Sequence, residues 1–227
     1  MTFTHRLPHR CLALAMCSVG LFFTGCASTP EPQLLSLPLP ADTPAAPNAQ
    51  PANAQAMLML RRVNIPEYLQ TLRVRYRAAD SVLAEWPNAV WAERLESGLT
   101  DHLLIRLRDR LPGWTVCERT CPPSKNAYAL TLDLSPLDLV RPAGELRAQA
   151  HWQFTWRGDS NNAVHDGARA LALRTTSDSA QGQAEAMAHM LDALAQDIAE
   201  QIMQQRSIDA AQSPRQTKPP TAVETAP

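Results

Sequence analysis

The stretch LRAQAHWQFTWR, residues 146–157, carries the strongest secondary-structure signal in the chain. Apolar side chains from Leu146 to Trp156 occupy every even position, and polar side chains from Arg147 to Arg157 occupy every odd position. A period of two places the two sets on opposite faces of an extended chain. The stretch therefore predicts a long β-strand with one face buried in a core.

Further strands are predicted on both sides of this stretch. Residues 128–135 alternate in the same way, and residues 141–144 can connect the two strands as an antiparallel hairpin. Residues 164–173 return as a third strand after a polar turn cluster. Shorter strands are predicted toward the N-terminus and in the middle of the chain, at 33–37, 57–63, 72–77, 82–86 and 114–117.

Two amphipathic helices are also predicted. Asn88 can cap a helix over residues 89–111, whose apolar stripe begins at Trp91. Ser177 or Ser179 can cap the last helix, and its apolar stripe consists of Ala184, Met187, Leu191, Leu194, Ile198 and Ile202. Helices and hairpin strands in this order predict an α+β fold in a single domain. We expect one mixed or antiparallel sheet with both helices packed on one face.

The folded domain is predicted to span residues 33–206. Within it, residues 39–56 are rich in Pro and Ala and predict a surface loop, and residues 207–227 predict a disordered tail. If the apolar island at 33–37 pairs into the domain, the preceding tether is short, about 20 Å for an extended Pro-rich chain. If the island is loose, the tether reaches about 90 Å. We expect the short tether, at residues 26–32.

The N-terminus has the layout of a bacterial secretory signal. Basic residues precede an apolar run from Cys11 to Phe23, and small residues follow it. The run is too short to cross about 30 Å of hydrocarbon as a helix. The sequence predicts a signal peptide over residues 1–25, and an ordinary secreted protein with a chance cysteine at Cys26 is the alternative.

Thr24, Gly25 and Cys26 resemble the lipobox of bacterial lipoproteins, although Phe23 stands where Leu is usual. The resemblance implies cleavage before Cys26, a diacylglyceryl group on its sulfur and a further acyl chain, such as palmitate, on its amine. Two or more acyl chains give stable anchoring. Ala27 occupies the position where Asp would retain such a protein at the inner membrane, which implies the periplasmic face of the outer membrane.

The net charge of the chain argues against nucleic acid as a partner, and its cysteine content leaves one pair to be interpreted. A formal net charge of −1 gives no argument for nucleic acid binding. Cys117 and Cys121 remain after the leader and the anchor are assigned, and an oxidising periplasm favours a disulfide between them. Free thiols are the alternative. A zinc site lacks further ligands nearby, and the C-x-x-x-C spacing does not match a redox motif.

A row of arginines is the one candidate binding feature. Arg73, Arg75 and Arg77 alternate with apolar residues, so they share one strand face. Three guanidinium groups on one face can hold phosphate head groups or an acidic partner surface. The simpler interpretation is a solvated face whose arginines pair with neighbouring carboxylates.

The sequence gives no argument for catalysis. It contains no H-E-x-x-H, no G-x-S-x-G and no Gly-rich phosphate loop. Ser160, His165 and Asp166 have the residue types of a triad, but they crowd into one predicted turn, where a separately oriented base is not expected. We expect a protein without enzymatic activity, metal or cofactor apart from the covalent lipid.

Several stretches together resemble the PqiC-like ABC-type transport auxiliary lipoproteins. The most specific are Ile65-Pro66-Glu67-Tyr68-Leu69 and Trp91-Ala92-Glu93-Arg94-Leu95, although Leu34 and Leu35 stand where aromatic residues are usual. The resemblance implies a partner, an MCE-domain protein that forms a hydrophobic conduit across the periplasm. It also implies a ring of copies that docks this conduit and supports phospholipid movement and envelope integrity. An assembly lipoprotein for a secretion or lipopolysaccharide machine, or a stand-alone lipid carrier, is the alternative.

Overall fold

The computed structural model describes residues 31–38, 56–118, 121–122, 127–157 and 164–212. Several predicted segments lie outside the described residues: the signal peptide, Cys26, most of the tether, nearly all of the Pro-rich loop, and residues 213–227.

Three long antiparallel strands form one side of the sheet. β6 (Ala127–Val140), β7 (Glu145–Arg157) and β8 (Val164–Arg174) follow one another as a meander. A short 3-10 turn and Gly144 connect β6 to β7, and the φ of 59° at Gly144 places it in the left-handed region that glycine adopts readily. The predicted hairpin and third strand are confirmed.

The other strands extend the sheet beyond β6. β2 (Ala56–Leu60) lies parallel between β6 and β5 (Trp114–Cys117). β3 (Arg73–Ala79) and β4 (Val82–Trp91) form a second antiparallel hairpin, and β1 (Gln33–Leu35) joins β4 in parallel. The island at 33–37 thus pairs into the domain, as predicted. Within the described part of the chain, the eight strands make one mixed sheet.

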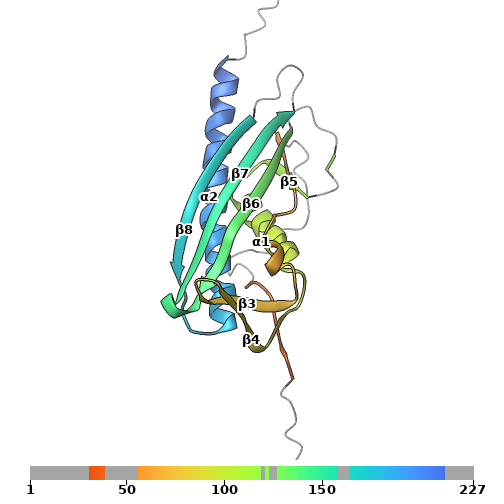
Figure 1. The fold of residues 1–227 in the computed structure, drawn as a ribbon. Helices are drawn as coiled ribbons and strands as arrows, with labels where there is room; N and C mark the ends of the chain where they lie inside the picture. The colour runs from red at the N-terminus through yellow and green to blue at the C-terminus, as the bar shows by residue number, and fades with distance from the viewer. Residues whose placement is uncertain (1–30, 39–55, 119–120, 123–126, 158–163, 213–227) are drawn as a thin grey trace, which may run out of the picture. The chain divides into compact units, whose positions relative to one another are not determined.

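Both helices cover the same face of this sheet (Figure 1). α1 (Leu95–Arg110) contacts β5, and α2 (Ala180–Gln212) contacts β7 and β8. The structure confirms the predicted α+β fold with one mixed sheet and two helices on one side. No described helix is long and apolar enough to cross a bilayer.

The alternation along β6 and β7 sets which face is buried. Leu130 lies opposite Phe154, and both are fully buried beneath the helices. His151 and Gln153, on the other face of β7, are exposed. A slip of one residue would exchange the two faces, so burial of the apolar set fixes the register.

The apolar stripe of α2 packs against this buried face. The predicted stripe residues are confirmed as core, each at most 1% exposed: Ala184, Met187, Leu191, Leu194, Ile198 and Ile202. The stripe of α1, from Leu95 to Leu107, is buried in the same core. Helix periodicity therefore identified the core correctly in both helices.

The predicted start of the first helix is wrong. Strand β4 continues through Ala89, Val90 and Trp91, and α1 begins only at Leu95. These three residues pair with β1 on one side, and the Trp91 backbone N–H donates to the Leu72 carbonyl on the other (2.7 Å). Pairing with two neighbouring segments outweighs the local Pro-Asn cap signal. Asn88 instead has a φ of 56°, a left-handed conformation that Asn tolerates.

The second helix begins as predicted and ends later. Ser179 precedes α2, and its hydroxyl accepts a hydrogen bond from the Gly182 backbone N–H (3.0 Å), the bond of an N-cap. The helix continues to Gln212, beyond the boundary expected at Arg206.

A polar cluster joins the two helices. Asp192 of α2 accepts a hydrogen bond from Arg106 of α1 and lies 3.2 Å from the Nε2 atom of buried His102. Burial lowers the pKa of the His102 imidazole, and the repulsion from Arg106 and His189 acts in the same direction, although the Asp192 carboxylate opposes it.

We expect substitution of Gly167 by Ala to destabilise the fold. A Cβ at this position would lie 2.4 Å from Trp152 Cε2. The indole cannot move freely, because it is buried and its Nε1–H donates to Gln201 Oε1 (2.7 Å). We predict a loss of about 1–3 kcal/mol in the free energy of unfolding, measured by urea denaturation. Ala168→Ser, exposed on the same strand, is the control and should change stability by less than about 0.5 kcal/mol. Equal effects of the two substitutions would contradict the prediction.

We also expect acid to weaken the helix pair through His102. Because the folded-state pKa lies below the unfolded value of about 6.5, the unfolded chain binds the proton more tightly. The contribution of His102 to the free energy of unfolding is complete above its unfolded-state pKa. It is lost as the pH falls through its folded-state pKa. Urea denaturation at a series of pH values should show that the free energy of unfolding falls toward lower pH. This fall should be shallower in the His102→Gln variant. Identical slopes in the two proteins would refute this assignment.

Candidate functional site

The arginine row predicted from sequence lies on one face of β3. Across the hairpin, Arg75 stands opposite Glu85 and Arg77 stands opposite Leu83. Arg73 stands opposite Val90. Residues directly opposite each other in a sheet share a face, so this outer face of the hairpin combines arginines with apolar side chains.

Arg77 is held by a carboxylate of the long sheet. Its Nε and Nη2 atoms donate to Oδ2 of Asp138 at 3.0 and 2.8 Å, and the Tyr68 hydroxyl donates to Oδ1 at 3.0 Å. The Asp138 side chain is only 8% exposed. Its hydrogen bond raises the pKa of Arg77, and burial followed by the Asp138 charge raises the pKa of Tyr68. This arginine is therefore part of the domain's internal structure.

Arg73 and Arg75 share one carboxylate. Glu85 lies 3.1 Å from Arg75 and 4.0 Å from Arg73, and Arg75 also donates to the Tyr68 carbonyl (2.8 Å). Arg73 is the most exposed of the three arginines, with 61% of its side chain accessible. Two positive charges against one negative charge leave this part of the face with an excess of one positive charge.

The helix-facing side of the hairpin is held by residues that the sequence analysis did not single out. Arg141 donates to both oxygens of Asp178 (2.8 and 3.0 Å) and lies 4.3 Å above the Trp86 ring. The Trp86 Nε1–H donates to Gln183 Oε1 of α2 (2.8 Å), and the Gln183 amide donates to the Arg75 carbonyl (2.8 Å). No local pattern marks these residues, because their partners are distant in sequence.

The cysteine pair for which a disulfide was predicted lies at and just after the end of β5. Cys117 and Cys121 form a disulfide with a Cα–Cα distance of 5.7 Å. Cys117 packs with Met57 and Ala127 in a small apolar cluster separate from the main core, and Cys121 covers it. This arrangement indicates a structural role for the bridge.

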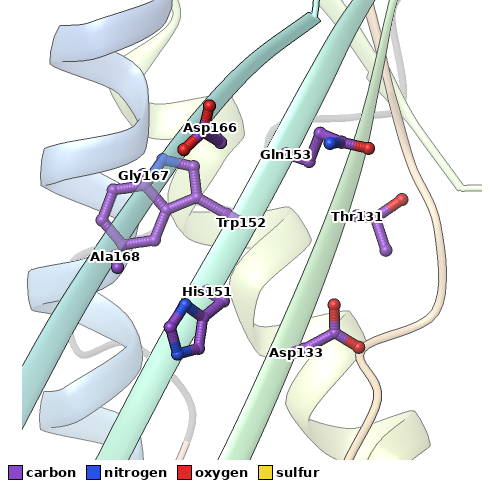
Figure 2. A pocket seen from close by; sticks show the side chains of 8 residues that line it. All are labelled: Thr131, Asp133, His151, Trp152, Gln153, Asp166, Gly167 and Ala168. Atoms are coloured by element: carbon purple, nitrogen blue, oxygen red, sulfur yellow. The ribbon is translucent and has the colours of Figure 1, made fainter.

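A polar hollow of about 290 Å³ lies on the open face of the meander (Figure 2). Thr131 and Asp133 of β6 and His151 and Gln153 of β7 line it. Asp133 stands opposite His151 in the sheet, and its Oδ1 accepts a hydrogen bond from the Asn64 side chain (2.6 Å). Among the described residues no group of three or more His, Cys, Asp or Glu could hold a metal ion.

The possible triad from the sequence does not assemble. His165 lies opposite Phe154 and stacks on its ring on the helix-facing side, with ring centroids 5.1 Å apart. Asp166, the next residue on the strand, points to the open face and lines the hollow. Ser160 lies outside the described residues.

Two solved structures share this fold. A crystal structure of an uncharacterized protein matches with a TM-score of 0.61 and 21% identity, over 76% of this chain and 99% of that chain. A Xanthomonas campestris protein of the DUF330 family matches with a TM-score of 0.56 and 15% identity, over 79% of this chain and 99% of that chain. No curated protein matches the sequence.

The family model for the ABC-type transport auxiliary lipoprotein component matches residues 36–199. The match includes the buried stripe of α1, that of α2 as far as Ile198, the hairpin with its arginines and the whole meander. It covers well over half of the chain. The protein therefore belongs to the family of ABC-type transport auxiliary lipoprotein components.

Proposed function

We propose that this protein is a non-catalytic lipoprotein of the outer membrane. It is held on the periplasmic face by acyl chains on Cys26 and docks the MCE-domain conduit of an ABC-type phospholipid transport system. The observation that carries the proposal is the family match over residues 36–199, which begins ten positions after a lipobox cysteine.

The start of the folded domain fits a close anchor. Cys26 and Gln33, the first residue of β1, are seven positions apart in sequence. Seven residues span at most about 25 Å when fully extended. The β1 strand is fixed in the sheet by pairing with β4, so the domain as a whole stays close to the surface that holds the acyl chains.

The packed interior of the domain favours a role in docking a partner protein over a role as a lipid carrier. The space between the sheet and the helices is filled by fully buried side chains such as Leu130, Phe154 and Ile198. The two surface hollows described, of about 290 and 390 Å³, are each lined in part by charged side chains, Asp133 and Asp166 in the first and Asp109, Arg110 and Glu200 in the second. An acyl chain requires an apolar lining. We therefore assign lipid passage to the partner conduit, with a ring of copies of this protein at its outer end.

The chemistry of the described residues supports a non-catalytic role. The polar groups Asp138 and Gln183 hold elements of the fold together. His165 and Asp166 point to opposite sides of the sheet. An auxiliary transport component needs a docking surface, and such a surface requires no nucleophile or general base.

Affinity purification of the full-length protein from membranes tests the proposal. We expect the wild-type protein in the outer-membrane fraction with an acylated Cys26 and an MCE-domain protein bound, both identified by mass spectrometry. The matched control is Cys26→Ser, which should move the protein to the soluble periplasmic fraction. An unmodified Cys26 thiol in soluble protein would refute the anchor. Recovery of an outer-membrane barrel would support an assembly role, and bound phospholipid in the isolated monomer would support a carrier.

A further inference from the structure

We propose that the outer face of the β1–β4–β3 corner rests on the phospholipid surface, with Leu34 and Arg73 as its contacts. This proposal depends on the lipid anchor at Cys26 proposed above. It gives the domain a second attachment to the membrane and therefore a fixed orientation, which attachment at Cys26 alone would not provide.

The sheet register brings the two contact residues to one face. Leu34 of β1 stands opposite Val90 of β4, and Val90 stands opposite Arg73 of β3. Directly opposed residues share a face, so these three side chains form a row across three strands. Figure 1 shows β3, β4 and the first described residues together at one end of the sheet, and the C-terminal end of α2 at the other end.

The row contains the most exposed large apolar side chain of the described residues. Leu34 is 69% exposed, the largest value among the large hydrophobic residues described. Four of the seven such exposed residues belong to β1, to β4 or to the residue before β3, namely Leu34, Leu72, Val82 and Leu83. Leu83 stands opposite Arg77 on the same face as Leu34, but Val82 and Leu83 lie at the far end of β4, seven or eight positions from Val90. Leu72 directly precedes Arg73 and points to the other face. Leu34 therefore carries the proposal, because scattered exposed leucines need no explanation but one in register with an exposed arginine beside a membrane tether indicates a contact surface.

The charge of the same face suits an anionic lipid surface. Arg73 and Arg75 share the single carboxylate of Glu85, and Arg73 remains largely exposed. Apolar side chains next to arginine are the composition of interfacial membrane-binding surfaces. Anionic head groups attract such arginines, and each contact is worth about a fivefold change in binding.

The short stretch of chain between Cys26 and Leu34 determines what this corner can contact. Leu34 is eight positions from Cys26, so it cannot lie more than about 30 Å from the anchored sulfur. The bilayer surface is therefore always within reach of this corner. A second copy would have to enter the space between the domain and the membrane to cover the same residues.

Spin labels on the full-length lipidated protein test the contact. Cys26 carries lipid and Cys117 is bonded to Cys121, so a label reacts with an introduced cysteine. We would label Leu34→Cys and, as the matched control, Ala170→Cys, an exposed position on the open face of β8. The proteins are reconstituted into phosphatidylethanolamine–phosphatidylglycerol vesicles, and collisions with oxygen and with a water-soluble nickel chelate are compared.

We expect the oxygen-to-nickel collision ratio to be several-fold higher at position 34 than at position 170. Arg73→Gln should lower the equilibrium constant for membrane contact about fivefold on these vesicles.

If a label at position 34 is as accessible to nickel as the control, on protein that floats with the vesicles, this proposal is overturned and the anchor is left intact. Protection from both reagents would show that a second copy covers the corner, which also overturns it. Protein that does not float with vesicles would refute the anchor, and this proposal with it.

Discussion

The N-terminal hairpin meets the long sheet through a single backbone register pair, Arg77 opposite Val140. One register pair cannot fix the angle between the hairpin and the long sheet. The side chain of Asp138 supplies a further contact that fixes this angle. Its carboxylate is nearly buried, and such a charge is stable only when its oxygens are paired and hydrogen-bonded. Arg77 and Tyr68 meet that requirement from β3 and from a 3-10 turn before it, Glu67–Leu69. Loss of one partner from a buried ion pair typically costs about 3 kcal/mol or more.

A second set of bonds holds the opposite side of the same hairpin. Gln183 of α2 bonds both Trp86 and the Arg75 carbonyl, and Arg141 bridges Tyr76 to Asp178. The hairpin is therefore fastened to the sheet on its outer side and to the helix layer on its inner side. Because β1 pairs with β4, the strand nearest the proposed lipid anchor is connected to the core through these bonds. In a lipoprotein that serves a transport complex, this connection would set where the domain stands relative to the membrane.

Much of the fold was predictable because its signals are local. The alternation at residues 146–157 and the stripe from Ala184 to Ile202 each arise from the burial of one face, and both were confirmed. The start of α1 was not predictable, since Asn88 carries a cap signal that the pairing of Ala89 to Trp91 overrides. The separate roles of the three arginines also could not be distinguished from sequence. Asp138 is 61 positions from Arg77, and Gln183 is 97 positions from Trp86, so no local pattern reports either contact.

If Asp138 fixes the hairpin, its removal should loosen that element and leave the rest of the domain intact. Amide hydrogen exchange of the Asp138→Asn variant measures this directly. The substitution preserves shape and removes the charge that Arg77 and Tyr68 require. Glu145→Gln is the control, because Glu145 pairs with Arg147, whose side chain is 55% exposed. We predict faster exchange across residues 73–91 and unchanged exchange in β7 and β8. Unchanged exchange in the hairpin, or equal acceleration throughout the domain, would contradict the central role of this carboxylate.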